Sequence, residues 1–566
     1  MGLAGSLLVS PWWRGAAAVV AGALPALAFP APSLWWLAYV ALVPWILLAR
    51  SAGSGRRAAC DGWLGGLGYM LAVHHWLLPS LHVFTVVIAA LLGALWAPWG
   101  RLVRRFLGGV PSRGRTAAAL AVVPSAWLMV ELVRSWQGLG GPWGLFGSSQ
   151  WQVTPALRLA SVGGVWLVSA LLVAVNTAVA VLVVVTLAHR RARAGTGSTR
   201  TGRGARVSRT GEGSDVPLAT GLSPAVSPAV AVPAVAGLVA VAAVAGAAWA
   251  WAPRPDAAGR VRVAVVQPGV VGEADGGAEK RFAREEALTR SLAGQDPDLV
   301  VWGESSVGFD LTDRPDLARR VAALSRDVGA DILVNVDARR SDRPGIFKST
   351  VLVGPQGPTG DRYDKMRLVP FGEYIPARSL LGWATSVGKA AGEDRRRGDR
   401  QVVMDVGHGV RVGPLVCFES AFPDMSRRLT RDGAGLLLAQ SATSSFQHSW
   451  APQQHASLGA LRAAETGRPM VHATLTGVSS VYGPDGARVG RPLGTEESTA
   501  RVYDVPMATG TTAYVRFGDW PVYGAVLVLV ALGVTEGLRS LRRRPAPGPH
   551  APPARTAHES PVRHGR

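Results

Sequence analysis

Cys417 has the clearest potential for covalent chemistry in this sequence of 566 residues. It follows the apolar run VRVGPLV (410–416) and precedes a helical pattern at 421–432. This order predicts a thiol at the carboxyl end of a strand, beside the N-terminal amides of a helix. Such amides stabilise a thiolate, which is the reactive form in nucleophilic catalysis. A lone cysteine is more often a small buried hydrophobe, so the catalytic interpretation depends on suitable partners.

Two other residues could supply the base and the positive charge that such a nucleophile needs. Glu304 closes the apolar run LVVWGE (299–304), and Lys365 lies in YDKMRLVPFGEY (363–374) shortly before Glu373. The alternative for Glu304 and Lys365 is an ordinary surface ion pair.

Lysine is rare in this chain, because only four of its 59 basic residues are lysines. A lysine at position 365 therefore indicates a need for a compact ammonium, which the planar guanidinium of arginine cannot replace. The other three lysines are interpreted as ordinary surface residues. They are Lys280, Lys348 and Lys389.

The segment that carries these residues, 260–505, alternates predicted strands and helices. Such alternation is typical of a layered α/β domain. Strands are expected at 261–269, 299–304, 331–338, 410–420, 436–442 and 470–486, the last ending in a Gly-Pro-Asp-Gly turn, with helices at 277–294, 421–432 and 452–467 and one more between 304 and 331.

The rest of the chain is dominated by long apolar runs. A helix needs roughly 20 apolar residues to cross the hydrocarbon core, and we therefore predict a polytopic α-helical membrane domain with about eight spans. The expected spans are 15–31, 33–49, 58–79, 82–100, 116–136, 157–187, 226–251 and 519–538. The first is expected to be a retained anchor rather than a cleaved signal, because it runs directly into the second.

The formal charge of +21 lies mostly in loops that follow the even-numbered spans. This asymmetry indicates cytoplasmic loops rather than a nucleic-acid surface, and no nucleic-acid partner is expected. It predicts cytoplasmic termini and an extracytoplasmic α/β domain, so Cys60 and Cys417 would lie on opposite sides and could not form a disulfide. The arginines concerned are Arg50, Arg56, Arg57, Arg101, Arg104, Arg105, Arg113, Arg115, Arg190, Arg191, Arg193, Arg200, Arg539, Arg542, Arg543 and Arg544.

These patterns divide the chain into six parts. Two basic segments rich in small polar residues, 189–225 and 545–566, are expected to be a disordered cytoplasmic loop and tail. The other parts are spans one to six in 1–188, the seventh span in 226–252, the catalytic domain in 260–505 and the eighth span in 519–538.

Three motifs in this order resemble the signatures of the apolipoprotein N-acyltransferase family. They are WGESS (302–306), KMRLVPFGEY (365–374) and LVCFES (415–420), and the resemblance extends to GPWGLFGSSQ (141–150) and YVRFGDWP (514–521). It covers nearly the whole chain. It implies eight membrane helices joined to a nitrilase-like domain, an α-β-β-α sandwich, on the extracytoplasmic face of the bacterial cytoplasmic membrane.

The resemblance also implies roles for individual residues. Glu304 would be the general base, Lys365 the oxyanion stabiliser and Cys417 the nucleophile, while Glu373 and Glu419 would support the site and a backbone N–H near Phe418 would help to hold the oxyanion. The chain departs from the family at Phe418, where tyrosine is common, in 268–282, which lacks tryptophan, and at 440–443, where Gln-Ser-Ala-Thr replaces an Asn-Asp-Ala type of run.

The implied reaction transfers a fatty acyl chain from a membrane phospholipid to the α-amine of the N-terminal diacylglyceryl-cysteine of an apolipoprotein, through a cysteine thioester. No metal or other cofactor is expected, and the enzyme is expected to act as a monomer. A membrane-tethered nitrilase-type amidase would use the same three residues with water as the acceptor. A transporter and an inactive lipoprotein-binding module are weaker alternatives, because the spans lack paired charges and the three reacting residues are present.

Four ionisable residues lie in or beside the predicted spans. Glu131 is either a functional group or the ion-pair partner of Arg134, one turn further on. His74 and His75 lack the spacing of metal ligands and are expected at the outer membrane interface with Trp76.

Overall fold

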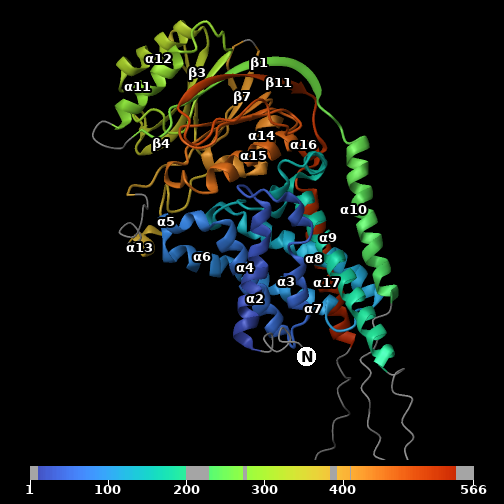
Figure 1. The fold of residues 1–566 in the computed structure, drawn as a ribbon. Coiled ribbons are helices and arrows are strands. Elements are labelled where there is room, and N and C mark those ends of the chain that lie inside the picture. The colour runs from blue at the N-terminus through green and yellow to red at the C-terminus, as the bar shows by residue number, and fades with distance from the viewer. Residues whose placement is uncertain (1–9, 199–227, 272–276, 383–391, 408, 543–566) are drawn as a thin grey trace, which may run out of the picture.

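The protein consists of a helical region and an α/β domain that lies against one end of it (Figure 1). The structure is a computed structural model and describes residues 10–198, 228–271, 277–382, 392–407 and 409–542. The predicted tail 545–566 and most of the predicted loop 189–225 lie outside these residues. Helix α9 continues to Ser198, into the segment for which no regular structure was expected.

Helices form the body below the α/β domain in Figure 1. A short piece, α5 (Leu78–Leu81), precedes the pair α6 and α7. The longer helices are α2 (Pro11–Ala23), α3 (Val43–Arg50), α4 (Gly55–Val73), α6 (Val83–Gly93), α7 (Trp96–Leu107), α8 (Arg113–Arg134), α9 (Thr154–Ser198), α10 (Ala231–Trp251) and α17 (Trp520–Arg542).

Four helices in the described part of the chain are long and apolar enough to cross a membrane. They are α8, the 154–190 part of α9, α10 and α17, and the pair α6–α7, bent by 41°, would be a fifth. Of the other three predicted spans, the third contains α4, which has 19 residues but is not among these apolar helices. The first is broken at Pro25, where α2 gives way to a 3-10 turn, and the second divides into a 3-10 turn and α3.

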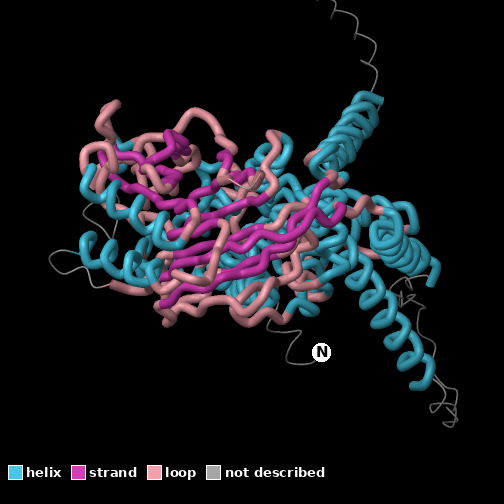
Figure 2. The backbone as a smooth tube through the Cα atoms, turned by 90° about the horizontal axis from the view of Figure 1, so that it is seen from above, coloured by secondary structure: helices cyan, strands magenta, loops and turns pink. Residues whose placement is uncertain are grey.

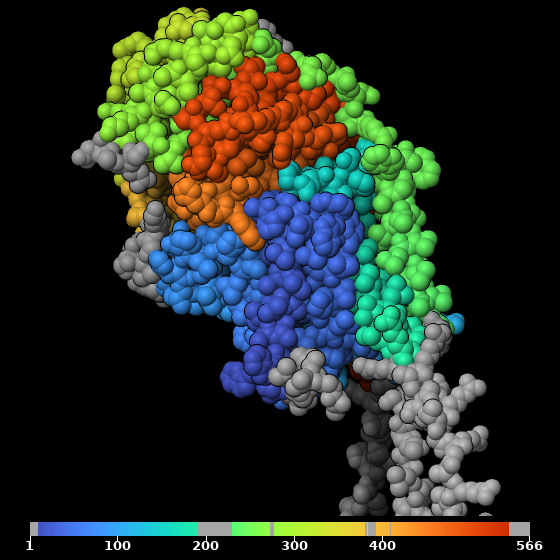
Figure 3. Space-filling view, in the orientation of Figure 1, coloured from blue at the N-terminus to red at the C-terminus, as the bar shows by residue number. Residues whose placement is uncertain are grey.

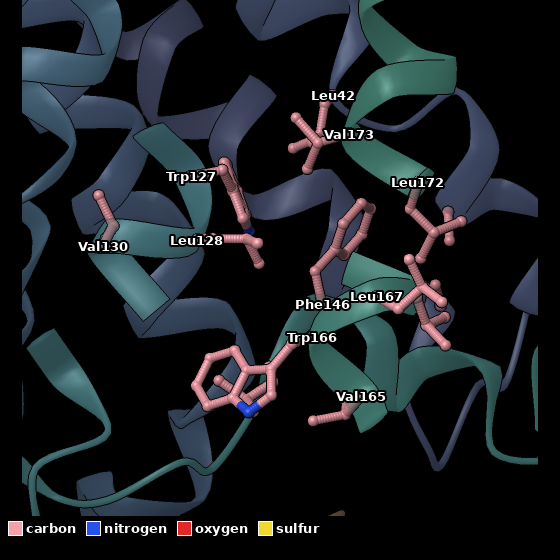
Figure 4. Packing of buried hydrophobic residues seen from close by; sticks show 14 of the residues in the cluster. Leu42, Trp127, Leu128, Val130, Phe146, Val165, Trp166, Leu167, Leu172 and Val173 are labelled. Carbon is pink, nitrogen blue, oxygen red and sulfur yellow. The ribbon is translucent and has the colours of Figure 1, made fainter. Parts of the chain in front are cut away.

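Small residues and tryptophans together allow the helices of this region to pack closely. At Gly62 of α4 an added Cβ would lie 2.4 Å from the Trp96 carbonyl oxygen, so only glycine permits α4 to approach α7 at this point. Beside this crossing Trp45 lies 4.8 Å from Trp99, measured between ring centroids. Figure 4 shows the neighbouring packing of Trp127 and Phe146.

The α/β domain contains two sheets packed face to face (Figure 2). One sheet has the order β11-β1-β2-β3-β4-β5 and the other has the order β10-β9-β8-β7-β6. The strands are β1 (Asp256–Gln267), β2 (Leu299–Trp302), β3 (Asp331–Arg339), β4 (Ile346–Gly354), β5 (Gly357–Asp364), β6 (Met404–Asp405), β7 (Arg411–Val416), β8 (Leu436–Ser441), β9 (Met470–Thr474), β10 (Ser480–Tyr482) and β11 (Thr499–Thr509).

Helices cover the outer faces of both sheets. One pair, α11 (Gly277–Arg290) and α12 (Pro315–Val328), packs on the six-stranded sheet. The pair α14 (Pro423–Arg431) and α15 (Ala451–Thr466) packs on the five-stranded sheet and faces the helical region (Figure 1). The predicted α/β layering is therefore confirmed, and its form is an α-β-β-α sandwich. Two short helices, α13 (Arg378–Leu381) and α16 (Ala513–Phe517), complete the described domain.

Helix α15 joins the two regions, and in Figure 3 the orange atoms of the α/β domain rest on the blue and teal atoms of the helices. Glu465 of α15 accepts a hydrogen bond from the backbone N–H of Val165 at 2.8 Å. This N–H is available because α9 is interrupted at Gly163 and at Gly164, which has a φ of 67°. Arg462 pairs with Glu465 at 2.9 Å and is buried with it. The helix layer formed by α14 and α15 is thus attached to α9 by a buried, charged contact.

Candidate active site

The backbone at Cys417 makes a sharp turn between β7 and a 3-10 helix, Cys417–Ala421. Cys417 has a φ of 51°, a conformation that is rare for a residue with a side chain. Such strain is often found where a fold presents a reactive group. The turn presents the thiol at the carboxyl edge of the five-stranded sheet.

Glu304 and Lys365 meet Cys417 from the other sheet. Glu304 follows the end of β2 and Lys365 follows the end of β5, and both side chains are buried. The Lys365 Nζ lies 3.2 Å from Glu304 Oε1 and 2.7 Å from Glu373 Oε1. The Cys417 thiol lies close enough to Glu304 and Lys365 for their charges to act on its ionisation. The three residues predicted to react therefore lie together between the two sheets, with Glu373 beside them.

Lys348 of β4 also belongs to this cluster, and its interpretation as a surface residue was wrong. Its side chain is only 13% exposed, and its Nζ lies 2.8 Å from Glu304 Oε1 and 3.1 Å from Glu373 Oε1. Two ammonium groups thus share the same two carboxylate oxygens. Lys280 on α11 is exposed, as expected, and Lys389 lies outside the described residues.

Burial and this charge arrangement determine the protonation of the site. Burial would raise the pKa of Glu304, but Lys348 and Lys365 together lower that pKa to about 2. Burial and the Glu304 carboxylate raise the pKa of the Cys417 thiol to about 12, against a smaller opposing effect of Lys365. The resting site therefore contains a neutral thiol beside a carboxylate, so the thiol must lose its proton as it attacks.

Glu419 positions the segment that carries Lys365 rather than contacting the Cys417 thiol. Its carboxylate accepts hydrogen bonds from the N–H groups of Val416 and Met366, both at 2.8 Å, and from the Tyr363 hydroxyl at 2.8 Å. It therefore connects the strand before Cys417 to the segment on both sides of Lys365. The Phe418 ring contacts Phe422 edge-on, with 4.9 Å between centroids.

No motif in the sequence marks His455 of α15, which supports the turn at the nucleophile. Its Nε2–H lies 3.0 Å from the Cys417 carbonyl oxygen, which also accepts a hydrogen bond from the Ser420 hydroxyl at 2.9 Å. Burial lowers the pKa of His455 to about 4, so the ring is neutral. The carbonyl and N–H of one peptide plane point in opposite directions. Fixing the Cys417 carbonyl therefore fixes the direction of the Phe418 N–H.

An apolar cavity of about 350 Å³ extends from Cys417 into the helical region. Near the thiol it is lined by Phe418 and His455, and further away by Met70, Leu81 and Ile88. The outer face of α6, which forms its far wall, exposes the apolar side chains of Val83, Val86, Val87 and Leu91. The cavity thus joins the reactive thiol to a helix with a lipid-compatible surface.

Among the ionisable residues of the helical region, Arg134 also lines this cavity. Glu131 accepts a hydrogen bond from the Phe146 N–H at 2.7 Å, and Arg134 donates to the Trp143 carbonyl at 2.6 Å. Both therefore hold the GPWGLFG segment, and the described contacts include no ion pair between them. His74 and Trp76 line the cavity, while His75 packs edge-on against Trp450 with 4.5 Å between ring centroids.

Comparison with known proteins agrees with these features. The Carbon-nitrogen hydrolase family matches residues 262–514, and this defines the class of the α/β domain. The family described as Apolipoprotein N-acyltransferase N-terminal domain matches residues 21–178.

Full-length relatives are similar to this chain over both the helical region and the α/β domain. The chain is 30% identical to the apolipoprotein N-acyltransferase of Azotobacter vinelandii over 565 residues, which covers 96% of this chain and 98% of that protein. It is 28% identical to the enzyme of Geobacter metallireducens over 91% of this chain and 94% of that protein. The chain therefore belongs to the apolipoprotein N-acyltransferase family. It is a multi-pass membrane enzyme that N-acylates lipoproteins with an acyl group from a lipid donor.

Proposed function

We propose that Glu304, Lys365 and Cys417 carry out this acyl transfer in two steps, through a thioester on Cys417. The supporting observation is that a base and an ammonium group lie beside a thiol that lines an apolar cavity. A phospholipid acyl chain could occupy this cavity while its ester carbonyl lies beside the thiol.

In the first step Glu304 takes the proton of the Cys417 thiol while the sulfur attacks the ester carbonyl carbon. The Lys365 ammonium and the Phe418 N–H stabilise the tetrahedral oxyanion. The bond between the carbonyl carbon and the glycerol oxygen then breaks, and that oxygen receives the proton from Glu304. A lysophospholipid leaves, and an acyl thioester remains.

In the second step the α-amine of a diacylglyceryl-cysteine attacks the thioester carbonyl. Glu304 accepts a proton from the attacking nitrogen, and the same two donors stabilise the second oxyanion. The carbon–sulfur bond breaks, and the sulfur regains its proton from Glu304. The products are an N-acylated lipoprotein and the free enzyme.

Lys348 and Glu373 complete the charge balance of this proposal. Glu304, Glu373 and Lys365 alone would leave one negative charge uncompensated in a buried site, which opposes any further negative charge on sulfur or oxygen. The ammonium of Lys348, paired with both carboxylates, removes that excess. We therefore assign Lys348 to the site as a positioning residue that also supports the oxyanion.

The arrangement of the chain in the membrane follows from its charge pattern. We propose eight spans, in which α2, α3, α4 and the bent pair α6–α7 supplement the four long apolar helices, with both termini cytoplasmic and the α/β domain outside. We also propose that the chain has the six parts predicted from its sequence and that the enzyme is a monomer.

The proposed orientation is tested with reporters. A reporter fused after Arg544 should be cytoplasmic, and one inserted near Gly490 should be external. Cleavage of the α/β domain only by a protease added to the cytoplasmic side would contradict this orientation.

The thioester is tested by incubating the purified enzyme with phospholipid alone. An acyl group should accumulate on Cys417, be released by neutral hydroxylamine and be absent from Cys417→Ala. Cys417→Ser should not turn over, because an alkoxide is harder to generate and an oxygen ester reacts less readily with an amine. Acyl transfer that persists in Cys417→Ala would contradict the assignment of the nucleophile.

A further inference from the structure

A second large cavity, of about 1030 Å³, lies at the end of the helical region away from the α/β domain. Its walls are formed by α7 and by the loops that precede α4 and α8. Five of the residues that line it are arginines, and we call it the arginine cleft. They are Arg50, Arg101, Arg104, Arg105 and Arg115.

The positive charge of the arginine cleft is poorly balanced. Arg105 forms an ion pair with Glu536 of α17, which is the cleft's only carboxylate partner among the described residues. Arg101 is exposed and forms no hydrogen bond or ion pair within the described part of the chain. Such a site attracts an anion, particularly where the surrounding dielectric is low.

Three of the guanidinium groups are already fixed in position by backbone carbonyls. Arg50 donates to the Leu107 carbonyl at 3.0 Å, and Arg104 donates to the Ala52 carbonyl at 2.7 Å. Arg115 donates to the Gly108 carbonyl at 2.9 Å. Each guanidinium has five N–H donors, so donors remain for a ligand. Because the groups are already held, binding would cost little side-chain entropy.

The length of α4 places this cleft relative to the active site. Gly55, at the start of α4, lines the arginine cleft, while His74, directly after its end, lines the cavity at Cys417. A helix of 19 residues is about 28 Å long, close to the roughly 30 Å thickness of the hydrocarbon core. The arginine cleft therefore lies at the opposite membrane face from the active site.

The cleft also has an apolar wall, formed by Ala59, Ala97, Pro98 and Leu102. A free phosphate would leave this wall unused, whereas a lipid would place its phosphodiester at the arginines and its acyl chains along the wall. We propose that the arginine cleft binds the headgroup of an anionic glycerophospholipid in the leaflet remote from the active site. This site is separate from that of the acyl donor.

The proposal is tested with the full-length enzyme in detergent, by native mass spectrometry during titration with phosphatidylglycerol or phosphatidylcholine. The wild type should bind phosphatidylglycerol in preference to phosphatidylcholine. Arg101→Gln combined with Arg105→Gln removes two guanidinium groups without cutting the hydrogen bonds to the loop carbonyls. It should weaken phosphatidylglycerol binding roughly tenfold or more.

The matched control is Arg56→Gln combined with Arg113→Gln. These two exposed arginines lie on the same end of the molecule but do not line the cleft, so this variant loses the same charge and should keep its affinity. Equal losses in both double variants would overturn the proposal, as would equal binding of the two lipids by the wild type. Competition by glycerol phosphate as effective as that by the lipid would also overturn it, because a free phosphate would then be the ligand.

The rate of thioester formation on Cys417 distinguishes a failure of this proposal from a failure of the proposed function. Thioester formation on Cys417 should proceed at the wild-type rate in both double variants, because the cleft lies a helix length from the thiol. If the Arg101/Arg105 double variant unfolds, equal binding of the two lipids by the wild type would still overturn the proposal.

Discussion

Two ammonium groups and two carboxylates share one buried site, so loss of either ammonium would leave one carboxylate charge unbalanced. Lys365 is completely buried, and its Nζ lies close to both Glu304 and Glu373. An arginine in its place would have to fit a larger, planar group into the same space. The identity of this residue should therefore matter more than its charge.

Lys365→Arg should fold normally but lower the rate of acyl transfer roughly 10²- to 10³-fold, as expected for the loss of one oxyanion donor. The rate is measured with phospholipid and a diacylated lipopeptide. Lys280→Arg is the control, because Lys280 is exposed on α11 and should behave as the wild type. Near-normal activity of Lys365→Arg would remove this lysine from the site.

Lys348→Met should shift the pH dependence of acylation. Lys348 and Lys365 lower the pKa of Glu304 to about 2, against the effect of burial, so the carboxylate stays ionised down to low pH. Loss of one ammonium raises this pKa, and the base is then protonated at a higher pH than in the wild type.

The acid limb of the rate profile for thioester formation should accordingly move to higher pH in Lys348→Met. Lys280→Met should leave the profile unchanged. A lower rate at every pH with the acid limb in its original place would contradict a role for Lys348 in setting the protonation of Glu304.

At the residue scale the sequence predicted Lys365 and not Lys348 for the site, although both lie beside Glu304, and the reason is physical. Lys365 lies in a motif and is one of very few lysines. Lys348 lies in IFKSTVLVG, which was not predicted to be a strand, and only the pairing of β4 with β3 directs its side chain toward Glu304. His455 was missed in the same way, because its contact with Cys417 depends on the packing of α15 on the five-stranded sheet.

The turn after β7 is held in its strained conformation by neighbouring elements. Ser420, in the 3-10 helix, and His455, on α15, both donate hydrogen bonds to the Cys417 carbonyl. They thereby aim the Phe418 N–H, which we assign to the oxyanion. Neither side chain needs to touch the substrate for this effect.

His455→Ala should lower the maximal rate of thioester formation by roughly fivefold, as for a lost hydrogen bond of about 1 kcal/mol. The phospholipid concentration for half-maximal rate should change little, because the apolar cavity keeps most of its lining. His455→Gln retains an N–H donor and should recover part of the rate. A change in half-maximal concentration alone would instead indicate that His455 contacts the lipid.

At the element scale the regular parts of the fold were predictable. The apolar strands β2, β7, β8 and β9 lie within the predicted segments, and β1 and β3 overlap theirs, because buried strands leave a strong pattern. In contrast, β5 has the sequence GPTGDRYD and packs at the sheet edge, so no such pattern marks it. The interruption of α9 at Gly163 and Gly164 was not predicted, since an apolar run through two glycines also fits an unbroken span.

The attachment of the two regions through α15 determines where the thiol lies relative to the bilayer. Arg462 donates to the Ala421 carbonyl, four residues after Cys417, and pairs with Glu465, which holds the interrupted part of α9. Both side chains are fully buried. Removing one member would leave an uncompensated buried charge.

Glu465→Gln should therefore destabilise the enzyme by roughly 3 to 5 kcal/mol, even though the amide can still accept from the Val165 N–H. Thermal unfolding in detergent measures this loss. A variant with Arg462→Met and Glu465→Leu together should be more stable than Glu465→Gln, since no unpaired charge remains. Unchanged stability of Glu465→Gln would show that the pair does not hold the two regions together.

At the scale of the whole molecule the sequence predicted a membrane region joined to an α/β domain, and this is confirmed. The arginine cleft and the contact between α15 and α9 could not be predicted. Their residues lie far apart in the chain, and only the packing of the helices brings them together.

The central claim, that the Cys417 thioester waits for an amine, is tested most directly by discharging the isolated acyl-enzyme. Adding a diacylated lipopeptide with a free N-terminal amine should transfer the acyl group to that nitrogen, whereas the same lipopeptide acetylated at its amine should leave the enzyme loaded. Release of free fatty acid at the same rate with or without the lipopeptide would contradict the account, because water would then be the acceptor.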